Sequence, residues 1–435
     1  MKALIVGTNY ELTSAAIPLL IRAEFEVDVL FYRHGYEDLK NRSLIHKLYQ
    51  SGTFEELPYL ASSIHLNNNY DLVVLGDEES LKLVLYSALS EQDKLALLPV
   101  KTVQNYAHLS SKIGFSQVLD SANIATPEYR VASNKAELIL ASKNFGYPFF
   151  IKIDSSGGGT GVFECESSKD ILKVIDTLVF PVLVQRKIEG KTLDLAGFYQ
   201  DGKLIYFSYS TFEKVIGNKF GPSVLREYAQ LGCIDPLIFE ELNQLGAALG
   251  ANGFMNTTCI EATADGKRYY FEGDMRPNAW VDYGRYIGSN DASKIKEYFL
   301  GGKTLKNRPE IKYGLPLKMV IPMISRLTFL ELISNYQHAW KYPDGVQGVF
   351  YFLALLVKQK CKTSYSQIIG HLEKSSSLLL YRGQIIRDLK NIGLSLIHKG
   401  LYRFELFIGV HIKPMISPKI MPKLRSIYRY LRFQE

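Results

Sequence analysis

Cysteine is scarce in this sequence, and its few thiols are not grouped. The 435 residues contain four cysteines, none of which forms a CxxC pair or joins a histidine at zinc-ligand spacing. The sequence therefore argues against a structural zinc site and a disulfide framework, and it predicts reduced thiols in a cytoplasmic protein. The cysteines are Cys165, Cys233, Cys259 and Cys361.

Long apolar segments are lacking as well. Residues 349–357, VFYFLALLV, form the longest apolar run near the C-terminus, and they fall well short of the roughly 20 residues that cross a bilayer as a helix. The N-terminal residues MKALIV predict a first β-strand rather than a signal peptide. We therefore expect neither a membrane-spanning helix nor a leader.

Acidic residues become rare after residue 305. Residues 306–435 contain 21 Lys and Arg but only 7 Asp and Glu, whereas the preceding residues contain 30 and 37. This basic segment has no nucleic-acid-binding motif, so we predict no nucleic-acid partner. Three surfaces remain open for it: an anionic membrane, which would make the protein membrane-peripheral, an acidic partner, and the acidic body of the chain itself.

Several common catalytic and nucleotide-binding motifs are absent. No GxGxxG follows the first predicted strand, no GxxxxGK[ST] P-loop occurs, and the HRD and DFG motifs of protein kinases are missing. The histidines are dispersed, and no Ser/His/Asp or Cys/His arrangement is evident. Any nucleotide site must therefore use another motif, and any catalysis must proceed without a protein nucleophile of these types.

The pattern of strands and helices predicts three domains. Apolar strands and helices alternate over residues 1–100, which predicts a parallel α/β domain. Residues 101–305, with a subdomain boundary near residue 180, predict antiparallel strands and helices. Residues 306–435 predict a basic, mainly helical domain. The expected elements include strands at 2–8 and 26–32, a helix over 14–25, a hairpin within 180–212 that contains a DGK turn, and a second hairpin within 253–277.

A lysine in an apolar strand precedes a loop that is rich in glycine. Lys152 is flanked by Phe150, Ile151 and Ile153, and a buried cation is costly unless an anion pairs with it. Four glycines follow within residues 157–161, and their unobstructed backbone N–H groups suit phosphate oxygens. The pattern indicates a polyanion site; the alternative is a flexible hairpin tip whose lysine reaches solvent.

A second motif, YFEGDMRP, places two acids and an arginine on one strand. Glu272 and Asp274 are two residues apart, so they project from the same face, and Arg276 follows on that face. Carboxylates beside a guanidinium suggest Mg²⁺ (or Mn²⁺) next to a phosphate. The alternative is a solvated strand edge with a local salt bridge.

The order and spacing of these motifs, with VLVQRKIEG between them, resemble the ATP-grasp superfamily. The likeness is greatest to the branch of carbamoyl phosphate synthase, biotin carboxylase and D-alanine–D-alanine ligase, and it spans roughly residues 100–300. The preceding segment resembles the Rossmann-like domain that usually comes before this fold. The resemblance thus implies a pre-ATP-grasp α/β domain, an ATP-grasp fold and a basic helical C-terminal domain, with ATP and Mg²⁺ as cofactors.

The resemblance also implies roles for individual residues. Lys112 and Lys152 would contact the nucleotide phosphates, and the ribose-binding acid would be Asp194 or Glu189. The phosphate-covering loop would consist of Gly157, Gly158, Gly159 and Gly161, and the adenine hinge of Gln185, Arg186, Lys187 and Ile188.

For the metal site, the resemblance implies that Glu272 is shared between two Mg²⁺ ions. Asp274 stands where the family usually has asparagine, and Thr258 stands at the upstream metal ligand, with Glu261 as the substitute if the register shifts. Arg276 matches the arginine near the transferred phosphoryl group.

The implied function is an ATP-dependent carboxylate–amine ligase in small-molecule or cell-surface biosynthesis. A small-molecule carboxylate would be activated as an acyl phosphate, and an amine would displace the phosphate. Asn278, Trp280 and Tyr283 are candidates for the acceptor site. Residues 220–230 are a candidate substrate loop in which Arg226 would face a carboxylate; the favoured alternative is an ordinary loop arginine. Two alternatives stay open: a small-molecule kinase on the same fold, and a non-catalytic nucleotide-binding protein at a membrane.

Overall fold

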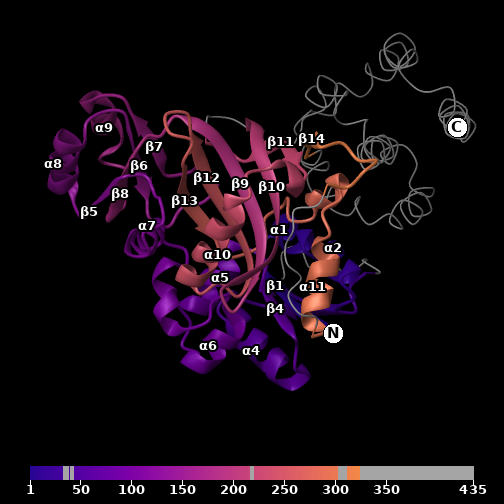
Figure 1. Ribbon diagram of the computed structural model, residues 1–435. Coiled ribbons are helices and arrows are strands. Elements are labelled where there is room, and N and C mark those ends of the chain that lie inside the picture. The colour runs from indigo at the N-terminus through magenta and orange to yellow at the C-terminus, as the bar shows by residue number, and fades with distance from the viewer. Residues whose placement is uncertain (33–38, 40–43, 216–219, 302–310, 324–435) are drawn as a thin grey trace, which may run out of the picture.

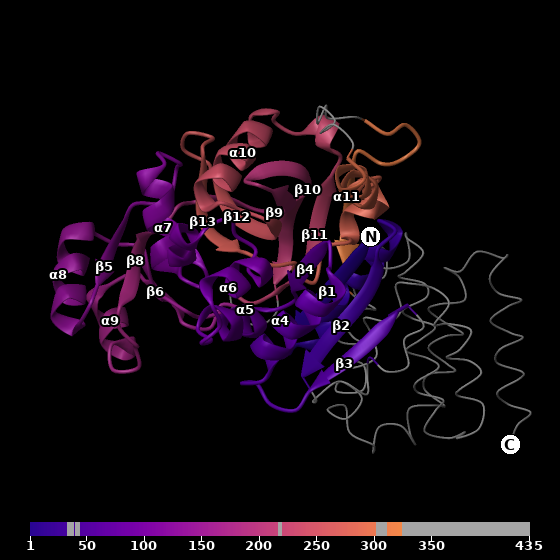
Figure 2. The same ribbon diagram turned by 90° about the horizontal axis from the view of Figure 1, so that it is seen from below.

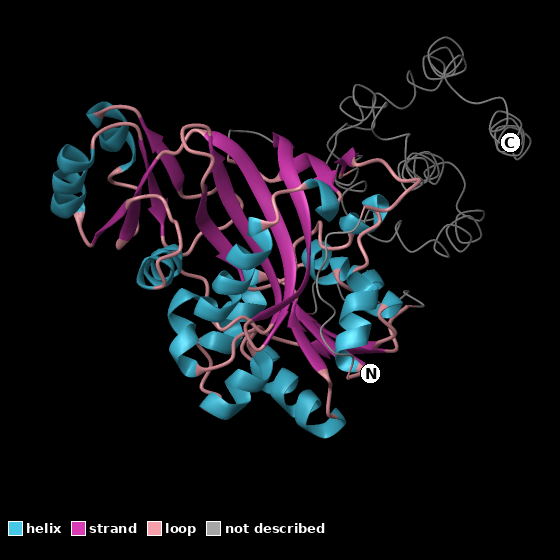
Figure 3. Cartoon of the chain, in the orientation of Figure 1, coloured by secondary structure: helices cyan, strands magenta, loops and turns pink. Residues whose placement is uncertain are grey.

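The described part of the chain forms three β-sheets with helices around them (Figure 1). The computed structural model describes residues 1–32, 39, 44–215, 220–301 and 311–323. Figure 2 shows a six-stranded sheet in the middle, with a four-stranded sheet on either side of it. Helices cover the sheets and fill the junctions between them, so the architecture is mixed α/β, as predicted (Figure 3).

The first sheet is parallel and has the strand order β3-β2-β1-β4. Its two central strands, β1 and β2, are buried along nearly their whole length, which explains their continuous apolar sequence. Both agree with the strands predicted at 2–8 and 26–32. The strands are β1 (Lys2–Gly7), β2 (Glu26–Tyr32), β3 (Lys47–Ser51) and β4 (Leu72–Leu75); the helices that follow β3 and β4 are α4 (Leu57–Asn68), α5 (Glu78–Leu85) and α6 (Glu91–Leu97).

The helix predicted over residues 14–25 is instead two short helices, α1 (Tyr10–Ala15) and α2 (Ile17–Arg22). The side chain of Asn9 accepts a hydrogen bond from the backbone N–H of Leu12 and so starts α1 earlier than predicted. Pro18 lies in the first turn of α2. Proline has no N–H to continue a preceding helix, so it favours a new start at this point.

The smallest sheet is antiparallel, with the order β5-β8-β6-β7. Its core contains Phe149, Ile151, Val182 and Val184, packed against helices α8 and α9. This unit carries the lysine strand and the glycine-rich loop. Its elements are β5 (Tyr129–Ala132), α8 (Lys135–Phe145), β6 (Phe149–Ile153), β7 (Val162–Cys165), α9 (Ser168–Val174) and β8 (Val182–Arg186); α7 (Lys112–Ser121) precedes it.

The six-stranded sheet has the order β13-β12-β9-β10-β11-β14 and is antiparallel throughout. The predicted DGK turn joins β9 to β10, where Asp201 and Gly202 have φ of 51° and 77°, as expected for a hairpin turn with two left-handed residues. The elements are β9 (Gly190–Gln200), β10 (Lys203–Val215), β11 (Ser223–Ala229), α10 (Leu237–Leu249), β12 (Gly253–Ala262), β13 (Arg268–Asp274), α11 (Asp291–Phe299) and β14 (Lys318–Pro322).

Strand register gives this sheet one apolar and one polar surface near its β12–β13 edge. Leu193, Leu195 and Cys259 belong to the large core cluster, together with residues of α7 and α10. Asn256 lies opposite Asp274, and Thr258 lies opposite Glu272; directly opposed residues project from the same face. The acids predicted for metal binding therefore lie on the polar face.

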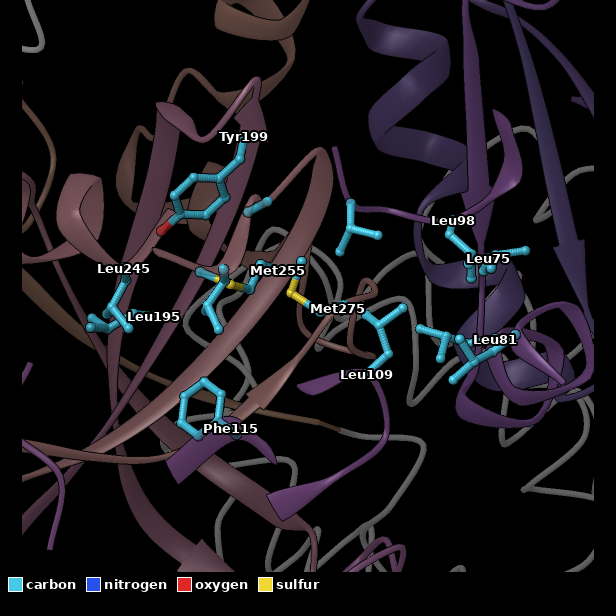
Figure 4. Close-up of a cluster of buried hydrophobic side chains, with 14 of the residues drawn as sticks. Leu75, Leu81, Leu98, Leu109, Phe115, Leu195, Tyr199, Leu245, Met255 and Met275 are labelled. Carbon is cyan, nitrogen blue, oxygen red and sulfur yellow. The ribbon is translucent and has the colours of Figure 1, made fainter. Parts of the chain in front are cut away.

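One apolar cluster connects the first sheet to the six-stranded sheet. Figure 4 shows Leu75, Leu81 and Leu98 on one side of this cluster and Leu195 and Met255 on the other. Leu109 and Met275 lie between the two groups. Because Met275 directly precedes Arg276, this cluster holds the end of the acidic hairpin against the first sheet.

Residue 305 does not end the six-stranded sheet. Strand β14 pairs with β11 in antiparallel register, although it lies beyond the predicted boundary. The remainder of the predicted helical domain, including the basic segment at residues 401–435, lies outside the described residues. None of the described helices is both long and apolar enough to cross a membrane. The proposed three-domain division stays a prediction.

A buried histidine is expected to make stability depend on pH. His108 is 1% exposed, and its Nε2 lies 2.8 Å from the Leu249 carbonyl oxygen. Burial lowers its pKa to about 4, so the unfolded chain takes up a proton between pH 6.5 and 4 and the folded chain does not. From pH 7.5 to 5, the free energy of unfolding should fall by about 2 kcal/mol through this group. Urea unfolding of the wild type and His108→Gln should show this loss only in the wild type.

Candidate active site

Lys152 is buried at the face of the small sheet that meets the acidic hairpin. The residue is 6% exposed, and its Nζ donates a hydrogen bond of 2.6 Å to Oε1 of Gln185 on β8. The same Nζ lies 4.5 Å from the ring centre of Phe271, the residue before Glu272. Burial lowers the pKa of Lys152 to about 8, although the charge of Glu272 opposes that shift; the charge of Lys112 adds to it. The two predicted lysines and the first predicted acid thus belong to one electrostatic cluster.

Lys112 holds the start of the glycine-rich loop. Its Nζ donates to the backbone carbonyls of Asp154 and Ser156, at 3.3 and 2.5 Å, and lies 3.2 Å from the Ser156 hydroxyl. The Asp154 carboxylate in turn accepts from the Ser111 hydroxyl and from the backbone N–H of Ile113. The beginning of α7 and the loop are therefore fixed to each other.

The glycines of the loop are of two kinds. A Cβ at Gly157 or Gly158 would have no atom within 4 Å, so these two residues present open backbone. A Cβ at Gly159 would lie 1.9 Å from the backbone oxygen of Phe220, and Gly159 and Gly161 have φ of 76° and 78°. Gly158 has a φ of 61°, so Gly158, Gly159 and Gly161 all adopt the left-handed backbone that favours glycine. The open space at Gly157 and Gly158 leaves room for a ligand.

Replacing Gly159 with alanine should displace the loop from Phe220 and weaken nucleotide binding. A left-handed backbone and a clash with backbone each cost roughly 1–3 kcal/mol, so we expect the apparent ATP affinity to fall by about tenfold or more. Gly146→Ala is the matched control, because Gly146 has a similar φ of 74° in the same small unit, lies outside the loop, and its added methyl group would meet no atom within 4 Å. ATP titration of both variants would contradict this account if the two lost affinity equally.

The hinge residues point in different directions. Gln185 is 1% exposed; its Oε1 accepts from Lys152, and its Nε2 is buried without a hydrogen-bond partner among the described residues. Arg186 does not share this environment: its guanidinium pairs with the carboxylate of Glu128 at 2.8 Å. Lys187 pairs with Glu189 and Glu164, which raises its pKa. Of the hinge side chains, Gln185 therefore has both the burial and the unused donor expected of a ligand contact; Ile188 is half-buried beyond the end of β8.

The two acids at the end of β13 differ in their contacts. Glu272 is partly buried, and its carboxylate makes no hydrogen bond or ion pair with any residue the structure describes. Asp274 pairs with Nη2 of Arg276 at 2.9 Å. Burial raises the pKa of Asp274 to about 7, opposed by the charge of Arg276 and reinforced by those of Glu272 and Glu78. A cation at this place would lower the repulsion between the carboxylates.

These residues fit a magnesium site of the open type. Mg²⁺ takes one or two protein carboxylates and completes its shell with water and substrate phosphate oxygens. Glu272 and Asp274 supply two carboxylates on one face, and Thr258 lies directly across from Glu272. The part of the chain that the structure describes contains no group of three or more acidic, histidine or cysteine side chains arranged as a closed metal cage.

Arg276 connects this cluster to the first sheet. Its guanidinium is 12% exposed, and Nε lies 3.3 Å from the carboxylate of Glu78, the first residue of α5. Glu78 is not among the site residues expected from the sequence. The available signal was the acidic loop GDEES directly after the apolar strand now seen as β4, at the edge where ligands of parallel sheets bind.

Asp194 does not fit the predicted ribose contact. Its side chain is 2% exposed and pairs with Arg226, and it also accepts from Asn256 at 3.1 Å and from Asn278 at 3.4 Å. Its oxygens are therefore occupied inside the polar network of the six-stranded sheet. Glu189, the other candidate, is exposed near the hinge.

Two further predictions are wrong. Arg226 does not lie in a substrate loop, because residues 223–229 form strand β11 and its guanidinium is buried between the rings of Phe212 and Trp280. Glu261 does not substitute for Thr258, because it lies opposite Arg268, with which it also forms an ion pair. A bulge between Thr258 and Cys259 keeps Thr258, not Glu261, across from Glu272.

Comparison with known proteins finds relatives in sequence and similar folds. No protein-family profile matches the chain. Over 194 residues it is 29% identical to phosphoribosylamine–glycine ligase from Clostridium acetobutylicum, which covers 42% of this chain and 44% of that protein. Its structure resembles N5-carboxyaminoimidazole synthetase from Staphylococcus aureus complexed with ADP (TM-score 0.56, 16% identity, 76% of this chain and 83% of that one). The chain therefore has the fold of ATP-grasp proteins.

The fold also resembles that of the L-amino acid ligase from Bacillus licheniformis, with a TM-score of 0.52 and 15% identity over 71% of this chain and 77% of that one. At such low identity, the solved structures show the fold. The chain spans less than half of the length of the curated ligase it matches. These similarities therefore leave open which substrates this chain binds.

Proposed function

We propose that this protein is an ATP- and Mg²⁺-dependent carboxylate–amine ligase that acts through an acyl phosphate. The observation that carries the proposal is the single cluster formed by Lys152, Glu272, Asp274 and Arg276. These residues come from two separate sheets. Phosphoryl transfer to a carboxylate requires cations that neutralise a polyphosphate, acids that bind a metal, and an arginine beside them.

The nucleotide would lie between the small sheet and the six-stranded sheet. Lys152 would neutralise its phosphates, the open backbone at Gly157 and Gly158 would cover them, and the free Nε2–H of Gln185 would donate to a ring nitrogen of the base. Glu272 and Asp274, with Thr258, would hold Mg²⁺, or Mn²⁺ in its place. The bound metal would neutralise charge on the phosphates; Lys112 would keep the loop in place.

Arg276 would stabilise the reacting group. Its guanidinium lies beside Asp274 and is largely buried, so its charge acts in a medium of low dielectric. It would stabilise the negative charge that develops when the carboxylate attacks the γ-phosphoryl group and when an amine then attacks the acyl phosphate. No protein nucleophile is needed for either step.

Three facts support a ligase over other ATP-using enzymes. The curated relative and one of the solved structures are named as ligases that join an amine or amino acid. The described residues hold a potential arginine–phosphoryl contact at the end of the acidic hairpin. A second charged residue, Glu78, reaches this point from the first sheet. We place the reaction in small-molecule or cell-surface biosynthesis.

The proposal is tested by phosphate release. Purified protein receives ATP, Mg²⁺, pooled small carboxylates and pooled amines, and inorganic phosphate and ADP are measured with and without each pool. Release that requires both pools supports the ligase. A phosphorylated product without free phosphate would indicate a kinase instead, and ATP binding without turnover in any combination would indicate a non-catalytic nucleotide-binding protein.

A further inference from the structure

The first sheet has a natural ligand position next to Arg276. Its strand order is β3-β2-β1-β4. The chain adds β2 and β3 on one side of β1 and then crosses over to add β4 on the other side, so the order of the strands switches between β1 and β4. Ligands of open parallel sheets bind at the carboxyl ends of the strands at such a point. The loops that leave β1 and β4 there carry Thr8, Asn9, Asp77 and Glu78.

These two loops are locked to each other. Asp77 is 2% exposed and accepts hydrogen bonds from the backbone N–H groups of Thr8 and Asn9, at 2.6 and 2.8 Å, and from that of Ser80 at 2.8 Å. A Cβ at Gly7 or Gly76 would lie 1.8 or 2.8 Å from Thr13, so both loops press against α1. Glu78 therefore starts α5 from a rigid platform.

The side chain of Glu78 extends from this platform to Arg276, the residue proposed to stabilise the reacting group. Its Oε2 lies 3.3 Å from Nε of Arg276, and its Oε1 makes no hydrogen bond to any residue that the structure describes. Its side chain is 30% exposed. The carboxylate is thus close to the place where an acyl phosphate would form, is reachable from solvent, and has one oxygen available.

Glu78 is also poorly placed to be a magnesium ligand. Glu272 and Asp274 share a face of β13. Glu78 reaches Arg276 from the first sheet and contacts Nε, whereas Asp274 contacts Nη2. A carboxylate that faces a guanidinium and solvent, rather than a phosphate, suits a cationic partner. In the proposed reaction the only cationic substrate is the amine.

We propose that Glu78 binds the attacking amine and receives its proton, and that the acceptor is accordingly a primary amine protonated at neutral pH, such as the α-amino group of an amino acid. The inference rests on the proposed ligase function. The ammonium loses one proton to Glu78, and the freed lone pair attacks the carbonyl carbon of the acyl phosphate. The C–N bond forms, the C–O bond to phosphate breaks, a second proton leaves with inorganic phosphate, and Glu78 returns its proton to solvent.

The experiment separates formation of the acyl phosphate from its use. Wild type and Glu78→Gln receive ATP, Mg²⁺ and pooled small carboxylates, L-amino acids included, with hydroxylamine, which is uncharged at neutral pH, as the nucleophile. Hydroxamate is measured. In parallel reactions without hydroxylamine, the same amino acids are the only amines, and amide product and phosphate are measured. Glu79→Gln is the matched control, since Glu79 is the next residue of α5 and is exposed.

For Glu78→Gln, we expect hydroxamate formation to stay within about fivefold of wild type, because a partly exposed ion pair to Arg276 contributes little. Amide formation should fall by roughly 100-fold or more. Glu78→Asp keeps the charge, so its rate of amide formation should be at least about tenfold higher than that of Glu78→Gln. Glu79→Gln should behave as wild type. If hydroxamate and amide formation fell equally, Glu78 would only position Arg276, and the inference would be overturned. It would also be overturned if neither product fell. Wild-type protein that makes no hydroxamate would instead refute the ligase function itself.

Discussion

Lys152→Met is expected to abolish binding of MgATP while the free protein stays folded. Lys152 is buried, with Gln185 and the ring of Phe271 beside it. Opposite charges about 4 Å apart interact by roughly 4 kcal/mol at a protein surface, so loss of the ammonium should weaken nucleotide binding about 1,000-fold. Methionine has a similar length and carries no charge to bury, so the thermal midpoint should change little. Calorimetric titration with MgATP and thermal unfolding measure the two effects.

The control for this variant is Lys135→Met, in the same small unit of the protein. Lys135 is the first residue of α8, and its side chain is 56% exposed in an ion pair with Asp176. It should bind MgATP like wild type. If Lys152→Met also bound like wild type, the buried lysine would have a structural purpose only, and the nucleotide site would have to lie elsewhere.

Glu272→Gln is expected to weaken Mg²⁺ binding and to remove most of the turnover. The carboxylate of Glu272 makes no hydrogen bond or ion pair within the described structure, so the free protein should lose no stability. Changes in residues that merely support a metal ligand cost 10–100-fold, so loss of a ligand should cost about 100-fold or more. Turnover measured against Mg²⁺ concentration should show both a lower maximum and a higher midpoint.

Glu261→Gln provides the comparison for the metal prediction. Glu261 lies on the neighbouring strand, at the position that a shifted register would have used. Its partner is Arg268, at 3.6 Å, so its removal should leave the Mg²⁺ dependence unchanged. A Mg²⁺ midpoint that moved in Glu261→Gln and not in Glu272→Gln would show that the metal site was assigned to the wrong face.

The elements that carry a strong local signal could be predicted from the sequence. The apolar runs of β1 and β2, the DGK turn between β9 and β10, and the acidic hairpin of β12 and β13 lie where they were expected. So does the lysine strand before its glycine-rich loop. In each case the signal depends on neighbouring residues only: burial on both faces, residues suited to a left-handed turn, or two-residue alternation.

What could not be predicted depends on contacts between distant segments. The partners of Asp194 are Arg226, Asn256 and Asn278, from three other parts of the chain, so no local pattern separates this buried acid from an exposed ligand. The same holds for Glu78, which meets Arg276 across 198 positions of sequence. The pairing of β14 with β11 was missed because an edge strand of five residues has no signal of its own.

The central claim is that the lysine strand and the acidic hairpin bind one metal–nucleotide complex. The most direct test is a crystal structure of the full chain with Mn²⁺ and a non-hydrolysable ATP analogue, in which Mn²⁺ is located by its anomalous scattering. We predict an anomalous peak in contact with the carboxylates of Glu272 and Asp274, bridged by phosphate oxygens to Nζ of Lys152. A triphosphate bound away from Lys152, or a metal bound away from both acids, would contradict the account.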